Sequence, residues 1–137
     1  MKIVLDTNIL ISGTFWTGSS FRILQLIQEK KIVLILSKEI LEEYEYIIQS
    51  EEILQKEVYQ EERKSATMKL IQLAKIVNPQ TSVQIIKDDP SDNKFIEAAI
   101  EGKAEYIITK DKHILNIKKY QNIKIITPEE FLEKFKF

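Results

Sequence analysis

Short apolar runs alternate with helical patterns along this chain, and this alternation limits its possible folds more than any other feature. The runs that we assign to strands are residues 3–5, 32–36, 82–86, 105–109 and 123–127. Strands that are apolar throughout, separated by helices, are typical of a parallel sheet covered on both faces. The pattern therefore predicts an α/β fold with a central, mostly parallel five-stranded sheet flanked by helices.

Capping residues and amphipathic spacing predict the helices between these strands. Ser37 is a suitable N-cap for a helix that runs to about residue 49, and Pro128 is suited to the first turn of the last helix. Residues 51–77 contain neither Gly nor Pro before Asn78 and read as one or two further helices. Another helix is expected over about residues 91–102.

Composition narrows the class of protein. A chain of 137 residues that is 44% hydrophobic and 30% charged is expected to form one domain over residues 1–137. The absence of cysteine excludes thiolate zinc sites and cysteine nucleophiles. No apolar run approaches the roughly 18 residues that span a bilayer, so we expect a cytoplasmic protein without membrane association. A net charge of −1 argues against a protein that coats nucleic acid.

Carboxylates occur where a parallel sheet would gather them. Asp6 and Asp111 each follow a predicted strand, Asp92 lies at a predicted helix start, and Glu43 lies on the helix after the second strand. The carboxyl ends of parallel strands meet at one edge of a sheet, where ligands bind in such folds. Acids that converge there repel one another unless a hard divalent cation such as Mg²⁺ or Mn²⁺ lies between them. The sequence therefore predicts a metal-dependent nuclease.

Each acid taken singly also has a purely structural explanation. Asp6, Asp92 and Asp111 could cap a turn or a helix, and Glu43 could belong to a solvated acidic face. Glu39 lies four residues before Glu43 on the same side of the helix, so spacing does not choose between them. Only the joint pattern favours a site.

Other α/β enzymes fit the residues less well. A phosphatase of the haloacid-dehalogenase type needs a second Asp two residues after the first, and Asn8 occupies that position. A dinucleotide or P-loop site needs a glycine-rich loop, but the three glycines of the chain form no such motif.

Four motifs carry a resemblance to a known family. They are VLDTNIL at residues 4–10, SKEILEEY at 37–44, DPSDNKF at 89–95 and TKDKHIL at 109–115. With these motifs the chain resembles PIN-domain proteins, and specifically the small prokaryotic members grouped with VapC-type toxins of toxin–antitoxin pairs. The resemblance covers nearly the whole chain and implies a three-layer PIN-like fold formed by a single PIN domain over residues 1–137.

The resemblance also implies roles for individual residues. The quartet that would hold one or two Mg²⁺ or Mn²⁺ ions and carry catalysis is Asp6, Glu43, Asp92 and Asp111, which resolves the earlier tie in favour of Glu43. The residues that would lie next to the quartet and orient it are Thr7, Asn8, Asp89 and Thr109. The implied function is a metal-dependent endoribonuclease, the toxin of a type II pair, with an RNA substrate, an antitoxin partner and a homodimeric state.

Several residues near the quartet are candidates for RNA contact. Lys110, Lys112 and His113 form a basic stretch beside Asp111, and Trp16 follows the first motif with a ring that could stack on a base. Each could equally belong to a solvated or packed surface. The alternative from another functional class is a PIN fold that serves as a non-catalytic RNA-binding or protein-interaction module.

Overall fold

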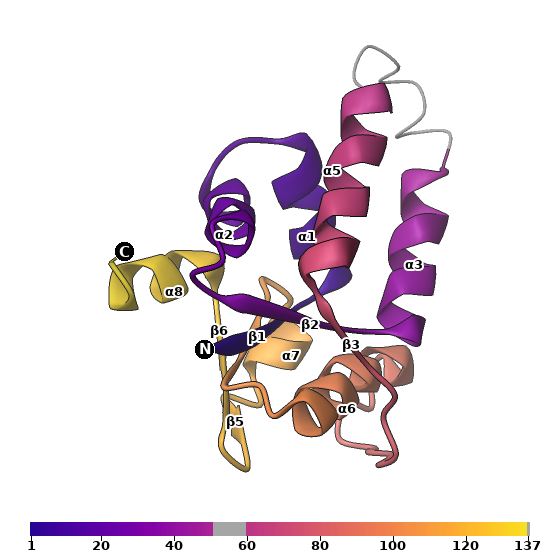
Figure 1. The fold of residues 1–137 in the computed structure, drawn as a ribbon. Coiled ribbons are helices and arrows are strands. Elements are labelled where there is room, and N and C mark those ends of the chain that lie inside the picture. Colours follow the sequence, from indigo (N-terminus) through magenta and orange to yellow (C-terminus); the bar gives the residue numbers. More distant parts are fainter. Residues whose placement is uncertain (51–59, 137) are drawn as a thin grey trace.

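The computed structural model describes residues 1–50 and 60–136, and its centre is a six-stranded sheet in the order β3-β2-β1-β4-β6-β5 (Figure 1). The strands are β1 Lys2–Leu5, β2 Val33–Ser37, β3 Lys75–Val77, β4 Tyr106–Ile108, β5 Lys119–Tyr120 and β6 Ile123–Ile126. Every neighbouring pair is parallel except β5 and β6. The predicted α/β class and mostly parallel sheet are confirmed, but the sheet has six strands where five were predicted.

Helices cover both faces of the sheet. They are α1 Thr7–Phe15, α2 Ser19–Gln28, α3 Lys38–Ile48, α5 Gln60–Leu73, α6 Asn93–Gly102, α7 Lys112–Leu115 and α8 Pro128–Lys134, with a 3₁₀ turn, η2, at Pro90–Asp92. In Figure 1, α1, α2, α3 and α5 lie above the sheet and α6 lies below it, which gives the three layers. No helix within residues 1–50 or 60–136 is long and apolar enough to cross a membrane.

The register of the two central strands decides where the polar residues meet. Leu5 pairs with Ile108 in the parallel β1–β4 ladder, so the next residues, Asp6 and Thr109, leave the sheet side by side. The amide of Asp6 continues the ladder by donating to the carbonyl of Ile108 at 3.2 Å. The carboxyl edge of the sheet therefore begins with an acid and a hydroxyl in contact.

The predicted strand at residues 82–86 is wrong. This segment runs beside α6, and side chains of that helix satisfy its backbone amides in place of a neighbouring strand. The amide of Val83 donates to Glu97 at 3.0 Å, and the amides of Ile85 and Ile86 donate to Asn93 at 3.1 and 2.9 Å. Its apolar pattern reflects the burial of Val83 and Ile86 in the core.

One of the two additional strands lies where the sequence predicted helix, and the other lies outside the predicted elements. The helix predicted over residues 51–77 ends at Leu73, and β3 follows it to pair with the edge of β2; residues 51–59 of that prediction lie outside the described part of the chain. The other, β5, is a two-residue strand that pairs with β6.

Helix α1 was not predicted because its sequence lacks an amphipathic pattern. Five of its nine residues are buried, so no polar face marks the helical period, and Gly13 interrupts it. That glycine is needed for packing, since a Cβ there would lie 2.7 Å from the side chain of Leu24 on α2 and 2.9 Å from the carbonyl of Ser20.

Candidate metal centre

Asp6 is the most deeply held acid of the predicted quartet. Its side chain caps α1, with one oxygen accepting from the amide of Ile9 at 2.8 Å and the other accepting from the Thr109 hydroxyl. The residue is only 4% exposed. Because both oxygens are engaged, this carboxylate has a fixed orientation at the edge of the sheet.

Thr109 connects two members of the quartet. Besides donating to Asp6, its hydroxyl accepts a hydrogen bond from the amide of Asp111 at 2.9 Å. Asp111 in turn caps α7 by accepting from the amide of His113 at 2.8 Å. Thr109 is fully buried, so a single hydroxyl fixes the positions of both aspartates relative to each other.

The four predicted acids line one small cavity of about 40 Å³. Its lining residues are Asp6, Thr7, Asn8, Glu43, Asp92, Phe95, Asp111 and Ile114. Glu43 reaches it from α3, whereas Glu39 lines a separate, larger groove. The folded chain thus brings together the quartet, Thr7 and Asn8, and it leaves Glu39 outside the cavity.

Burial and mutual repulsion act on the acids in the cavity. Burial raises the pKa of Asp6 above its usual value; the hydrogen bonds from Thr109 and Ile9 oppose this shift, and the charges of Asp111 and Glu43 add to it. Burial also raises the pKa of Asp92 to about 6, with a further rise from Asp89 that Lys94 partly offsets. The ionised quartet is therefore costly without a positive charge nearby.

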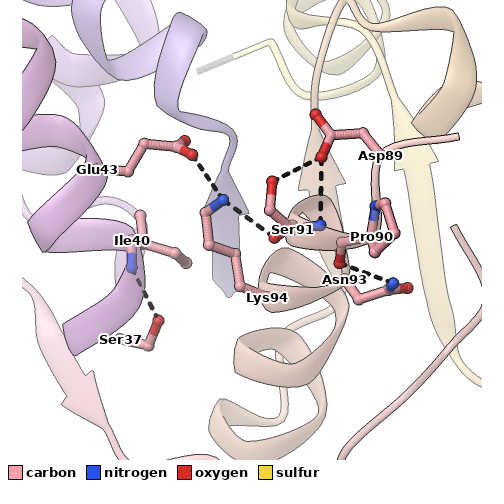
Figure 2. A network of polar contacts seen from close by, with 8 residues as sticks. All are labelled: Ser37, Ile40, Glu43, Asp89, Pro90, Ser91, Asn93 and Lys94. Carbon is pink, nitrogen blue, oxygen red and sulfur yellow. Dashed lines mark hydrogen bonds and ion pairs between the residues drawn. The ribbon is translucent and has the colours of Figure 1, made fainter. Parts of the chain in front are cut away.

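Lys94 supplies part of that charge (Figure 2). Its ammonium donates to Oε2 of Glu43 at 2.7 Å and to the carbonyl of Ser91 at 3.0 Å. The lysine side chain is 11% exposed and that of Glu43 is 33% exposed, so this ion pair is screened less than a surface pair. It ties α3 to the start of α6.

Asn93 fixes the loop that carries Asp92 and Lys94. Its amide nitrogen donates to the carbonyls of Ile86 and Pro90 at 3.0 and 2.9 Å, and its amide oxygen accepts the two backbone amides of the 82–86 segment described above. Asp89 closes the turn by accepting from both the amide and the hydroxyl of Ser91 (Figure 2). Asp89 therefore occupies a turn position beside the site.

The chemistry of the lining suits a hard divalent cation. Four carboxylates share the cavity, and the buried hydroxyl of Thr7 has no hydrogen-bond partner among the described residues, so an ion with bound water would satisfy it. The carboxylates lie further apart than the ligands of a single ion would. In the described ranges, no three ligating side chains are close enough together to hold an ion as they stand. Because Glu43 is drawn toward Lys94, binding would require small side-chain shifts.

The candidate RNA-contacting residues are dispersed. Lys110 is exposed and pairs with Glu129 at 3.2 Å, His113 is exposed and pairs with Asp88 at 3.0 Å, and Lys112 is exposed on α7. Trp16 lies at the far end of α1 from Asp6, roughly 15 Å along the helix, and lines a different pocket with Phe21. The structure therefore does not bring Trp16 to the quartet.

Sequence reasoning missed the roles of Lys94 and Asn93. Both lie in the DPSDNKF motif, in which only the acids Asp89 and Asp92 were predicted to have roles. A usable signal existed for Lys94, because a cation at the N-terminus of a helix opposes the helix dipole and so calls for another reason to be there. Nothing local marked Asn93, since its partners lie in a segment expected to be a strand.

Comparisons with known proteins find a matching family model and a similar solved structure. A family model described as PIN domain matches residues 2–113. Among solved structures, the chain resembles one described as VapBC2 from Rickettsia felis bound to a DNA fragment from their promoter, with 18% identity and a TM-score of 0.60. The match covers 91% of this chain and 97% of that one, and it shows a shared fold. Comparison with curated protein sequences finds no match.

Proposed function

The chain belongs to the PIN-domain family, and from that premise we propose that it is a metal-dependent endoribonuclease that hydrolyses RNA phosphodiesters. One observation carries the proposal. Asp6 and Asp111, joined through the hydroxyl of Thr109, line one cavity with Glu43 and Asp92 at the carboxyl edge of the sheet. This is where α/β folds bind ligands, and the donor set is that of a Mg²⁺ or Mn²⁺ site.

In the proposed enzyme the four acids bind the cation, and the polar residues around them position the acids. Asp6, Glu43, Asp92 and Asp111 would hold the cation, which when bound activates water and offsets charge on the phosphodiester. Thr109 keeps Asp6 and Asp111 in register, and Thr7 and Asn8 offer polar groups at the same wall. Asp89 keeps the turn before Asp92 closed.

Basic residues beside the cavity would contact the RNA backbone. Lys110 and Lys112 flank Asp111 and are exposed, as is His113. The Lys110–Glu129 pair lies in solvent, where an ion pair contributes little, so a phosphate can displace the glutamate at small cost. Trp16 is too far along α1 to stack on a base at the quartet.

We further propose that the enzyme is the toxin of a toxin–antitoxin pair. The support is the likeness of fold to VapBC2 and a groove of about 870 Å³ beside the cavity. Four glutamates line this groove together with two lysines, which suits a basic segment of a protein partner. A homodimer remains a prediction that light scattering on the purified chain would test.

A second candidate function has one observation in its favour. The Lys94 ammonium compensates Glu43 without any metal, so the fold could persist as a non-catalytic binding module. Asp6 and Asp92 keep raised pKa values in spite of this lysine, which favours the nuclease.

A cleavage assay separates the two candidates. A mixed pool of single-stranded RNA is incubated with Mn²⁺ or EDTA and with wild-type protein, Asp6→Asn or Glu133→Gln. Glu133 lies on the exposed surface of α8, so its variant controls for the loss of one carboxylate charge elsewhere. The nuclease predicts cleavage by the wild type and Glu133→Gln with Mn²⁺ only. RNA binding without cleavage, and without Mn²⁺ uptake, would support the module.

A further inference from the structure

Lys94 occupies a position that helix stability does not explain. It is the second residue of α6, close to the positive end of the helix dipole, where a cation is disfavoured. Its side chain is 11% exposed, although lysine is rarely buried without a partner. Its ammonium donates to Glu43 and to the carbonyl of Ser91, and it lies 4.8 Å from the centre of the Phe95 ring.

The position of Glu43 relates this lysine to the carboxylate cavity. Glu43 lines both the small cavity and the large groove, whereas Lys94 lines the groove and is not among the residues that line the cavity. The ammonium therefore approaches Glu43 from the groove side and takes up one of its two carboxylate oxygens at 2.7 Å. Its charge also acts on Asp92, whose pKa it lowers.

We propose that Lys94 is a built-in cation that restricts the carboxylate cavity to a single divalent ion. This inference rests on the proposed function and specifies its metal content. In two-ion sites the ions lie about 3.5–4 Å apart and share carboxylates. A second ion shared through Glu43 would lie beside a fixed ammonium of like charge.

The shared position of Glu43 points to the same limit, because Glu43 lies where the cavity meets the groove. A second ion that used Glu43 on the groove side would meet the Lys94 ammonium, which already holds one oxygen of that carboxylate. Removing the charge of Lys94 would remove the barrier on the side where the groove offers room.

The test is the number of Mn²⁺ ions bound per chain, measured by titration calorimetry and by the electron spin resonance of bound Mn²⁺. Wild-type protein is compared with Lys94→Met, Lys94→Gln and Lys94→Arg. The uncharged glutamine side chain can still donate a hydrogen bond to Glu43. Lys94→Gln therefore gives a usable result if the methionine variant does not fold. Lys87→Met is the matched control, since Lys87 lines the same groove and, among the described residues, forms no hydrogen bond or ion pair with the quartet.

We expect one ion in the wild type, in Lys94→Arg and in Lys87→Met. Lys94→Gln and Lys94→Met should bind two ions and give the exchange-coupled spectrum of a close Mn²⁺ pair. Two ions in the wild type, or one in folded Lys94→Gln, would overturn the inference and leave the nuclease proposal standing. No bound ion in the wild type would overturn both.

Discussion

Thr109 donates its hydroxyl hydrogen to the carboxylate of Asp6 across two neighbouring parallel strands. The same oxygen accepts the amide of Asp111, so the hydroxyl uses its donor and an acceptor position at once. Asp6 and Thr109 are both buried, and the strand register brings them together without any loop rearrangement. This contact orients two of the four acids.

Removing that hydroxyl should therefore weaken metal binding. Thr109→Val keeps the shape but leaves a buried carboxylate oxygen and the Asp111 amide without their partner. We expect Mn²⁺ affinity to fall about 10–100-fold, as for other residues that orient metal ligands, measured by titration calorimetry. Thr109→Ser retains the hydroxyl and should stay within a few-fold of the wild type. Equal affinity in the valine and serine variants would refute this role.

Asp6→Asn should separate metal binding from folding. The amide can still cap α1, and it removes a buried charge that Asp111 and Glu43 repel. The metal-free variant should therefore melt at or above the wild-type temperature. Mn²⁺ at a hundred times its Kd should stabilise the wild type by about 2.7 kcal/mol and Asp6→Asn hardly at all.

Thermal denaturation with and without Mn²⁺ measures both effects, with Glu133→Gln as the control that keeps the full Mn²⁺ response. A metal-free Asp6→Asn protein that fails to fold would show that the Asp6 carboxylate is itself needed for folding, and would contradict this separation.

The stability of the metal-free protein should depend on pH through Asp92. The pKa of this acid is about 6 in the folded protein and near 3.8 when it is unperturbed. The folded state thus binds the proton more tightly, and its stability falls as pH rises from about 4 to 6. The Asp92→Asn variant should not lose stability over this pH range for this reason.

The difference in unfolding free energy between Asp92→Asn and the wild type should therefore grow in favour of the variant over that range. It should then level off above pH 6. Because Asp92 is partly exposed, we expect at most about 1 kcal/mol after solvent screening. Urea denaturation in EDTA across this range measures it, and a difference that does not change with pH would contradict the assignment.

Asn93 should contribute strongly to the stability of the fold. Asn93→Ala removes the four hydrogen bonds that join α6 to the 82–90 segment. We expect a loss of about 2–3 kcal/mol, together with faster hydrogen exchange at the amides of Ile85 and Ile86. Asn122→Ala, at an exposed turn, should change stability by less than about 0.5 kcal/mol. Unchanged exchange at the two isoleucines would show that another contact holds the segment.

The elements that sequence predicted well are those whose signal is local. β4 and residues 3–5 of β1 are apolar and buried, Ser37 caps its helix as predicted, and Pro128 begins the last helix as predicted, after a complete capping box at Thr127. The elements that were missed depend on tertiary context. α1 is buried on most sides, and residues 82–86 use side chains of α6 where a strand would use a neighbouring backbone.

The candidate site was also predictable from sequence only in part. The acids could be named because the ends of parallel strands converge, which is a property of the topology. The choice between Glu39 and Glu43 could not be made from spacing, and it depends on how α3 packs against α6. The ion pair between Lys94 and Glu43 joins residues 51 positions apart, which no local pattern reveals.

The anomalous scattering of Mn²⁺ in crystals of the wild-type chain tests the central claim most directly. The account predicts a peak in the cavity lined by Asp6, Glu43, Asp92 and Asp111, with carboxylate oxygens about 2.1 Å away. No peak in that cavity at saturating Mn²⁺, or an ion held only by Glu39 and Glu42 in the neighbouring groove, would contradict it.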